Sequence, residues 1–370
     1  MAIQILIFGN EIGGQMQLLA NGLRSRGIAA TAAAEWNPAD KRRFLCDMQL
    51  GMTGHTKCDY TARRAFAVFA MANYDIFHFF FGVSLLSIWR FHKIDLPLLK
   101  AMKKRVFVHF RGSDVRDSHF FDAAFAHWGI VAPAGEPPRQ WSRCDQERSL
   151  RLWRRWADVL LISEPGLWDL VPDAILSPQV LDMAEWRRVS PIAEKDEINI
   201  VHAPTNRRKK GTEFVIAACE ALRGKGLPVR LHLIEGMPYS EVRRAYEAAD
   251  IAVDQVLYGW HGKFSLELMA MGVPVVCYIR EDLRQFRPDL PIISATPTTL
   301  AEVLEGLIRD TERRRRLAEA GPAYVRKYHS LEVILDQLVG LYGIEGETPV
   351  ASHWLNPTPG AGRADHAARS

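Results

Sequence analysis

A glycine, a lysine and a glutamate are spaced so that backbone N–H groups and a carboxylate could point into one cleft. Gly262 opens a predicted helix over 263–271, and a glycine and a proline end it. Because Lys263 and Glu267 are four residues apart, they share one face of that helix. Free N–H groups at the start of a helix suit phosphate, and a carboxylate suits a pair of sugar hydroxyls. The alternative interpretation is a packing helix with an exposed glutamate.

A run of four basic residues, 207–210, comes just before another predicted helix. The apolar run 198–203 predicts a buried strand, so the basic run lies between a strand end and a helix start. That position favours phosphate binding by Arg207, Arg208 or Lys210. A solvated surface is the usual alternative, and a nuclear signal or nucleic-acid patch is a third interpretation.

The N-terminal half offers two further candidate sites. A predicted first strand runs into Gly13 and Gly14, and a double glycine lets a ligand approach the backbone closely. His109 and Arg111 lie two residues apart at the end of a later predicted strand, so they point to the same face. Open α/β sheets bind ligands at this carboxyl end. A structural histidine and a surface arginine are the alternative.

Composition limits the classes of protein that need to be considered. A chain of 370 residues with 48% hydrophobic and 24% charged residues is globular, and its length predicts two domains. A net charge of +4 argues against a dedicated nucleic-acid binder. The five cysteines have no metal spacing, which indicates a reducing compartment. The N-terminus lacks the features of a signal peptide, and no apolar run reaches the ~20 residues that span a bilayer. We therefore expect a soluble or peripheral protein of the cytoplasm.

The order of elements predicts an α/β fold with two similar halves. We expect an N-terminal domain over 1–183, a charged linker over 184–197 and a C-terminal domain over 198–342. The last segment, 343–370, is rich in Pro, Gly, Ala and polar residues, which is typical of a disordered tail.

The segment 147–161 is predicted to be helical, with arginines on one face and Leu152, Trp156 and Val159 on the other. Such a helix could lie on the inner face of an anionic membrane. More often it packs its apolar face on a sheet and leaves its arginines in water. Both interpretations stay open.

These features together resemble retaining glycosyltransferases of the GT-B fold, most closely family 4. The resemblance covers about 1–342 and rests on the Gly13-Gly14 turn, the step from Lys210 to Gly211, and the run from Glu267 through Val276. It implies two Rossmann-like domains facing across a cleft, with a C-terminal helix that crosses back to the N-terminal domain. The activity implied is sugar transfer from a nucleoside-diphosphate sugar to an acceptor hydroxyl, with retention of anomeric configuration.

The resemblance also implies roles for individual residues. No cofactor beyond the donor is obligatory and no metal is required; the partners are the sugar nucleotide and an acceptor (a glycan, a lipid-linked glycan or a small molecule), without nucleic acid. Glu267 would hold the ribose and Lys210 the diphosphate. Further donor-binding candidates are Gly13, Gly14, Arg207, Arg208, Gly211, Met237, Gly262 and Lys263. The candidates for catalysis are His109, Arg111 and Lys210.

Two positions depart from the family pattern. The first glutamate of the E-x7-E motif, which orients the donor sugar, falls at Gly259, and Asp254 is the nearby acid that could compensate. The family's cleft histidine falls at Arg111, so either His109 has that role or Arg111 contacts the donor. A nucleotide-sugar epimerase and a non-catalytic sugar-nucleotide-binding module are the alternative functions.

Overall fold

The computed structural model describes residues 3–35, 45–50, 57–87, 93–116, 125–129, 143–187, 196–237 and 239–344. Most of the linker expected at 184–197 and of the tail expected at 343–370 lies outside these residues. The described residues form two compact units. The first comprises those of Met1–Asp122, Ala134–Val180 and Leu331–Val350, and the second those of Ala123–Pro133 and Leu181–Ser330.

The first unit is built on a seven-stranded parallel sheet in the order β3-β2-β1-β4-β5-β6-β7. The central strands are apolar on both faces, as expected when helices cover both sides of a parallel sheet. The strands are β1 (Gln4–Gly9), β2 (Ala29–Ala34), β3 (Met48–Gln49), β4 (Ile76–Phe80), β5 (Arg105–Phe110), β6 (Val159–Ile162) and β7 (Ile175–Leu176). The helices are α1 (Gln15–Ser25), α2 (Lys57–Asn73), α3 (Asp95–Ala101), α5 (Arg143–Trp156), the 3₁₀ helix η3 (Pro165–Asp169) and α13 (Leu331–Tyr342).

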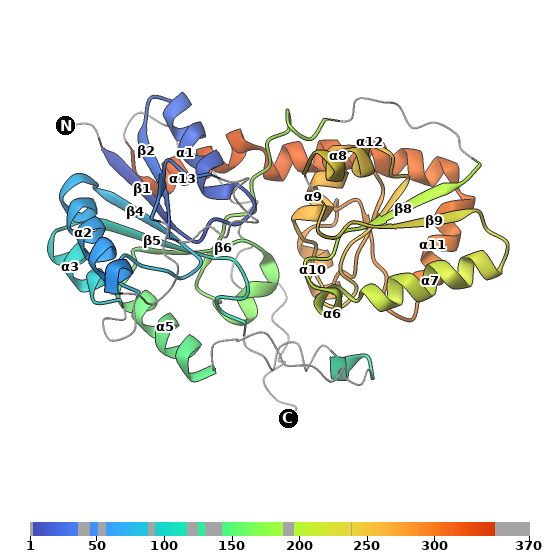
Figure 1. Cartoon of the computed structure of the whole chain (residues 1–370), viewed down its shortest axis with the longest axis horizontal. Helices are drawn as coiled ribbons and strands as arrows, with labels where there is room; N and C mark the ends of the chain where they lie inside the picture. The colour runs from blue at the N-terminus through green and yellow to red at the C-terminus, as the bar shows by residue number, and fades with distance from the viewer. Residues whose placement is uncertain are drawn as a thin grey trace. The chain divides into compact units, whose positions relative to one another are not determined.

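Helices cover the two faces of this sheet unequally. The crossovers β1 to β2 and β4 to β5 run in opposite directions, so right-handed connections place their helices on opposite faces. Figure 1 shows α1 and α13 on one face and α2, α3 and α5 on the other. The last helix, α13, packs Leu335 and Leu338 into the same core as Leu19 and Leu23 of α1. The predicted return of the C-terminal helix to the N-terminal domain is therefore confirmed.

The predicted helix over 147–161 is wrong at its C-terminal end. The helix α5 ends at Trp156, and residues 159–162 form the buried strand β6. Trp153 of α5 is fully buried, whereas the arginines of the helix are exposed. The apolar side of α5 therefore packs inside the unit, and the alternation of apolar and basic residues did not distinguish the end of a helix from a following strand.

The second unit is built on a five-stranded parallel sheet in the order β12-β11-β10-β8-β9. Figure 1 shows α7 and α12 on opposite sides of this sheet. The strands are β8 (Ile198–His202), β9 (Val229–Leu233), β10 (Ile251–Val253), β11 (Val275–Val276) and β12 (Ile292–Ile293). The helices are α6 (Arg207–Lys210), α7 (Thr212–Gly224), α8 (Tyr239–Glu247), α9 (Lys263–Ala270), α10 (Glu281–Phe286), α11 (Leu300–Arg309) and α12 (Thr311–His329).

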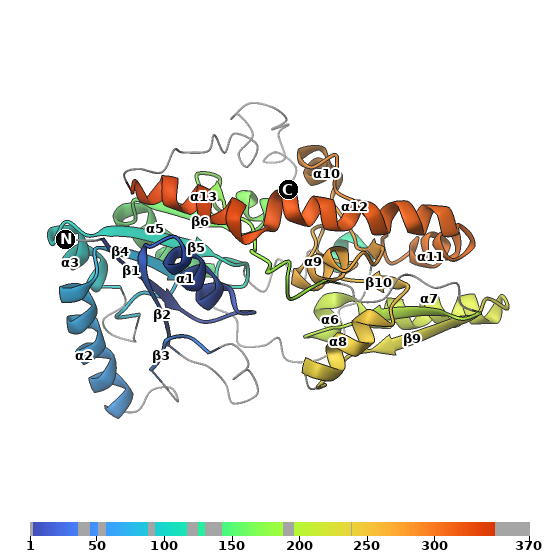
Figure 2. The ribbon, with the colours of Figure 1, turned by 90° about the horizontal axis from the view of Figure 1, so that it is seen from above.

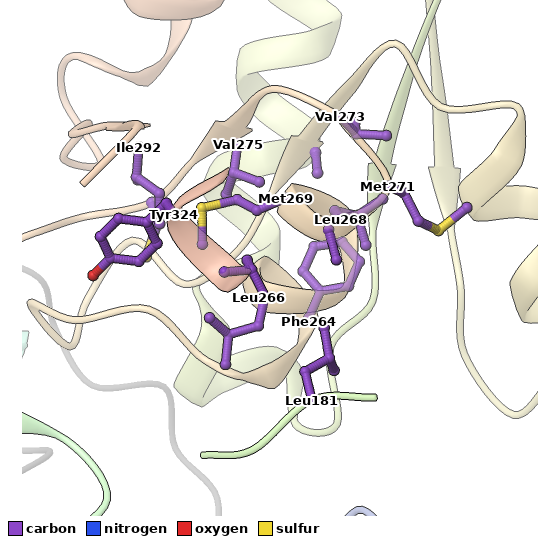
Figure 3. Packing of buried hydrophobic residues seen from close by; sticks show 14 of the residues in the cluster. Leu181, Phe264, Leu266, Leu268, Met269, Met271, Val273, Val275, Ile292 and Tyr324 are labelled. Carbon is purple, nitrogen blue, oxygen red and sulfur yellow. The ribbon is translucent and has the colours of Figure 1, made fainter. Parts of the chain in front are cut away.

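The helix α9 is the most deeply buried helix of the candidate site. Figure 3 shows its side chains Phe264, Leu266 and Leu268 within one apolar cluster that also holds Tyr324 of α12. The two helices approach closely because α12 has a glycine at the contact: a Cβ at Gly321 would lie 2.6 Å from the carbonyl oxygen of Met269. This packing fixes the position of α9 against its sheet.

Residues 125–129 belong to the second unit although residues on both sides of them in the sequence belong to the first. Phe125 is buried in the core that contains Val215 of α7. The Trp128 ring lies edge-on to Tyr278, with 5.0 Å between ring centroids. The chain therefore contributes a short segment from its N-terminal half to the unit that carries the basic run.

Candidate functional site

An ion pair between Lys210 and Asp254 lies at the carboxyl edge of the second sheet. The Lys210 Nζ is 2.7 Å from Asp254 Oδ1 and 2.9 Å from Gln255 Oε1. Asp254 directly follows β10, and its Oδ2 accepts hydrogen bonds from the Gly262 backbone N–H at 2.9 Å and from Ser265 Oγ at 2.6 Å. One buried carboxylate thus connects the end of the basic run to the start of α9.

The charges of this pair are compensated within the protein. The Asp254 side chain is 1% exposed and the Lys210 side chain is 14% exposed. Burial alone would raise the pKa of Asp254, but the Lys210 ammonium and the hydrogen bonds from Ser265 and Gly262 outweigh it and lower the pKa to about 2. Asp254 is therefore ionised at neutral pH and holds Lys210 in a fixed position.

Lys263 and Glu267 share one face of α9, as their spacing predicts. The Lys263 Nζ is 3.5 Å from Glu267 Oε1. Glu267 is buried, which excludes the interpretation of an exposed glutamate on a packing helix. Gly262 precedes the helix in an extended conformation, and a Cβ there would lie 3.2 Å from both Lys210 Nζ and Asp254 Oδ2. The structure thus brings Lys210, Gly262, Lys263 and Glu267 into one neighbourhood.

The two arginines of the basic run do not point to the same place. Arg207 is paired with Glu235 at 2.7 Å, and both side chains are partly exposed. Arg208 places its guanidinium over the Phe125 ring, 5.0 Å from the ring centroid. Gly211 has a φ of 73° and caps α6, and Met237 is exposed in the loop after β9. Their roles in donor binding stay predictions.

The side chain of Arg280 packs against Gly259 and leaves no room for a side chain there. Its φ of 79° is in the left-handed region, and a Cβ there would lie 2.6 Å from Arg280 Cγ. The Arg280 backbone N–H donates to the Gly259 carbonyl at 2.9 Å. The aliphatic part of Arg280 therefore occupies the space into which a side chain at position 259 would project.

In the first unit, the double glycine begins α1. Gly13 and Gly14 have φ values of 67° and 78°, and Gly14 is the N-cap of that helix. The preceding Glu11 is buried, and its Oε2 accepts from the Met16 backbone N–H at 3.0 Å. Burial raises the pKa of Glu11, more strongly than these hydrogen bonds lower it. The sequence interpretation missed Glu11, which local spacing does not distinguish from a loop glutamate.

His109 and Arg111 lie at the carboxyl end of β5, and both approach Phe80. The His109 ring is 5.0 Å from the Phe80 ring between centroids, and the Arg111 guanidinium carbon is 5.5 Å from the Phe80 centroid. His109 is buried, with Nε2 2.9 Å from the Ser177 carbonyl oxygen. Burial and the nearby Arg111 charge hold the pKa of His109 well below its usual range, so its ring is neutral. The part that either residue has in catalysis stays a prediction.

Asp114 is a third polar group at this end of the first sheet. Its carboxylate accepts backbone hydrogen bonds from Gly112 at 2.7 Å and from Arg111 at 3.0 Å. Burial raises the pKa of Asp114 to about 6, against the opposing effect of these hydrogen bonds. It thus stabilises the turn that follows β5.

Within the described ranges, no group of three or more His, Cys, Asp or Glu side chains is arranged to hold a metal ion. In the same residues, no helix combines the length and apolar character needed to cross a membrane.

Part of the chain is similar to a known family. Residues 200–340 match the family described as glycosyl transferase-like. Among curated proteins, none matches the sequence of this chain. The family match covers β8 to α13 and thus every candidate residue of the second unit.

Solved structures share the fold at low sequence identity. Sucrose-phosphate synthase from Thermosynechococcus elongatus superposes with a TM-score of 0.62 at 14% identity, covering 92% of this chain and 98% of that one. The catalytic domain of starch synthase IV from Arabidopsis thaliana, bound to ADP and acarbose, gives 0.56 at 9%, covering 92% and 100%. A lipopolysaccharide outer core galactosyltransferase gives 0.55 at 12%, covering 92% and 99%. At these identities the likeness establishes the fold, and the predicted architecture of two Rossmann-like domains is confirmed.

Proposed function

We propose that this chain, a glycosyltransferase of the GT-B fold, moves a sugar from a nucleoside-diphosphate sugar to an acceptor hydroxyl with retention of anomeric configuration, as family 4 enzymes do. The observation that carries the proposal is the network of Lys210, Asp254 and the start of α9 at the carboxyl edge of the second sheet. Open α/β sheets bind ligands at that edge. The basic run beside it supplies charge that matches a diphosphate.

The chemistry follows from where negative charge develops. When the glycosidic bond to the diphosphate breaks, the leaving group gains charge, and fixed cations and N–H donors near it lower the barrier. Lys210 is held in place by Asp254 and Gln255, so it need not reorganise during the reaction. The first-turn N–H groups of α9 have no acceptor within the helix. Glu267, buried beside Lys263, is the carboxylate that would accept the ribose hydroxyls.

The acceptor hydroxyl would attack the face of the sugar from which the diphosphate leaves, so no protein nucleophile is needed and configuration is retained. Donor binding falls mainly to the second unit. The first unit offers Arg111, the Gly13-Gly14 turn, the buried carboxylate of Glu11 and the half-buried carboxylate of Asp114 for the acceptor side.

Direct binding measurements test the donor site. Lys210→Met alone would leave the Asp254 charge uncompensated, so the informative variant is the charge-balanced Lys210→Met/Asp254→Asn. Calorimetry with nucleoside diphosphates should show binding weakened about tenfold or more in this variant, because a hydrogen bond to a charged group is lost. Binding of the nucleoside without phosphates should change little. Glu267→Gln should weaken both ligands, whereas the matched control Glu302→Gln, at an exposed position of α11, should weaken neither.

Turnover then distinguishes the functions. Release of free nucleoside diphosphate that requires an acceptor identifies a transferase, and the product anomer determined by NMR tests retention. Isomerisation of the donor without an acceptor would identify an epimerase. Binding without turnover across acceptors would identify a non-catalytic module. If neither the Lys210 variant nor the Glu267 variant changes nucleotide binding, the site assignment is wrong.

A further inference from the structure

The outer face of the helix layer α2–α3–α5 combines two features that rarely occur together on a soluble domain. Leu98 of α3 and the two residues that cap this helix, Ile94 and Met102, are spaced four apart and are 49%, 43% and 48% exposed. On α2, Val68 and Phe69 are 71% and 47% exposed. Residues three to four apart share one helix face, so α3 presents an apolar stripe to solvent, opposite the buried side that holds Leu96 and Leu99.

Beside this apolar stripe runs a stripe of arginines on α5. Arg148, Arg151 and Arg155 are exposed and spaced by three and four residues, so they line one face of that helix. None of the three forms an ion pair within the described ranges, whereas Arg143 and Arg154 of the same helix are paired with carboxylates. The three arginines therefore carry positive charge that nothing described in this chain compensates.

The two stripes point away from the same sheet face. Helices α3 and α5 are in contact, and Figures 1 and 2 show α2 beside α3 in the same layer. The apolar side of α5, including Trp153, is already buried inside the unit. The membrane contact considered for α5 from its sequence would therefore need its apolar part from the exposed residues of α3 and α2 in the same layer.

We propose that this face, defined by the exposed apolar residues of α2 and α3 and the arginines of α5, docks on the surface of an anionic lipid bilayer. This goes beyond the proposed transfer reaction and does not depend on it. Large apolar side chains can enter the boundary between headgroups and acyl chains, and arginines beside them are attracted to anionic headgroups. Large apolar side chains exposed on helices of one layer, together with uncompensated charge, are typical of an interaction surface.

Charge argues for lipid over a second copy of the chain. In a twofold contact the same patch meets itself. The unpaired Arg148, Arg151 and Arg155 of one copy would then approach those of the other, and like charges would oppose association. An anionic bilayer instead compensates all three.

Vesicle binding by the full chain tests the proposal. The protein should sediment with vesicles made of equal parts phosphatidylcholine and phosphatidylglycerol, and not with phosphatidylcholine alone. Each basic residue near an anionic surface contributes about 1 kcal/mol, or roughly fivefold. The variant Arg148→Gln/Arg151→Gln/Arg155→Gln should therefore lose roughly 100-fold in partitioning, and added salt should weaken wild-type binding. Leu98→Ser/Met102→Ser should also reduce binding, with its charge unchanged.

The matched control removes the same charge elsewhere. Arg313, Arg316 and Arg326 of α12 are exposed and belong to the second unit. Changing these three to glutamine should leave vesicle binding within about twofold of wild type. That is less than the roughly fivefold effect expected of one basic residue at the membrane surface. The proposal is overturned if the two triple variants bind equally, if wild type binds neither vesicle, or if Leu98→Ser/Met102→Ser acts only by dissociating a dimer in light scattering. Binding to a DNA duplex through the same arginines, without vesicle binding, would also overturn it.

Discussion

Removing the ammonium of Lys210 should destabilise the second unit, and removing its partner carboxylate as well should restore much of that stability. The two groups are 2.7 Å apart, and Asp254 is 1% exposed. In Lys210→Met, the carboxylate keeps its bonds from Gly262 and Ser265 but loses its counter-charge. Breaking a buried pair from one side costs about 3–5 kcal/mol, because the remaining charge is uncompensated.

The lowered pKa of Asp254 indicates a cost in the same direction. Its pKa is lowered from 3.8 to about 2 in the folded protein, a shift that corresponds to about 2 kcal/mol of unfolding free energy. Because the folded-state pKa lies below the unfolded one, this stability is present above about pH 4 and is lost as the pH falls toward 2. Without Lys210, burial would raise the pKa of Asp254 above its unfolded value. Lowering the pH should therefore increase the stability of the variant relative to its value at pH 7, whereas it decreases the stability of wild type.

Hydrogen exchange in graded urea, followed for peptides of β10 and α9, reports the unfolding free energy of this unit separately from the other. Lys210→Met should lose about 3–5 kcal/mol at pH 7 and less at pH 4. The variant Lys210→Met/Asp254→Asn should be more stable than Lys210→Met, giving a coupling energy of about 2–3 kcal/mol in the double-mutant cycle. The reasoning fails if the double variant is no more stable than Lys210→Met, or if the difference from wild type is equal at both pH values.

Two more changes test the packing that holds the site. Gly321→Ala should destabilise the second unit by about 1–3 kcal/mol, because its Cβ would lie 2.6 Å from the Met269 carbonyl oxygen. In the control Gly306→Ala, the new Cβ would have nothing within 4 Å. This control should stabilise α11 by about 0.5–1 kcal/mol in urea unfolding. Phe125→Ala should cost about 3–5 kcal/mol and raise hydrogen exchange in α7 of the second unit; an effect confined to the first unit would contradict its placement.

The sequence predicts best those helices that have a glycine, proline or serine at a boundary. The expected C-terminal helix is α13, and the predicted 263–271 helix differs from α9 by one residue. Each has a glycine or a serine at a boundary, so local chemistry fixes its ends. The predicted neighbourhood of Lys263 and Glu267 follows from helix geometry for the same reason.

Contacts between segments that are distant in the sequence could not be predicted from local patterns. Lys210 and Asp254 are 44 positions apart, and neither flanking sequence records that they pair. The packing of Phe125 into the second unit depends on the chain leaving one unit and returning, which no composition change marks. Periodicity reports which face of an element is apolar, but it does not report which other element covers that face.

The contacts of Asp254 answer a question that the sequence left open, namely whether this acid could replace the one missing at Gly259. Its Oδ1 holds Lys210, and its Oδ2 holds Gly262 and Ser265. Because the side chain is also only 1% exposed, a sugar hydroxyl would reach Asp254 only if the start of α9 moved away. The space beside Gly259 is filled by the stem of Arg280, whose guanidinium donates hydrogen bonds to Asp282. Asp254 therefore does not replace the acid that the family pattern has at position 259, and a side chain at that position would have to displace Arg280.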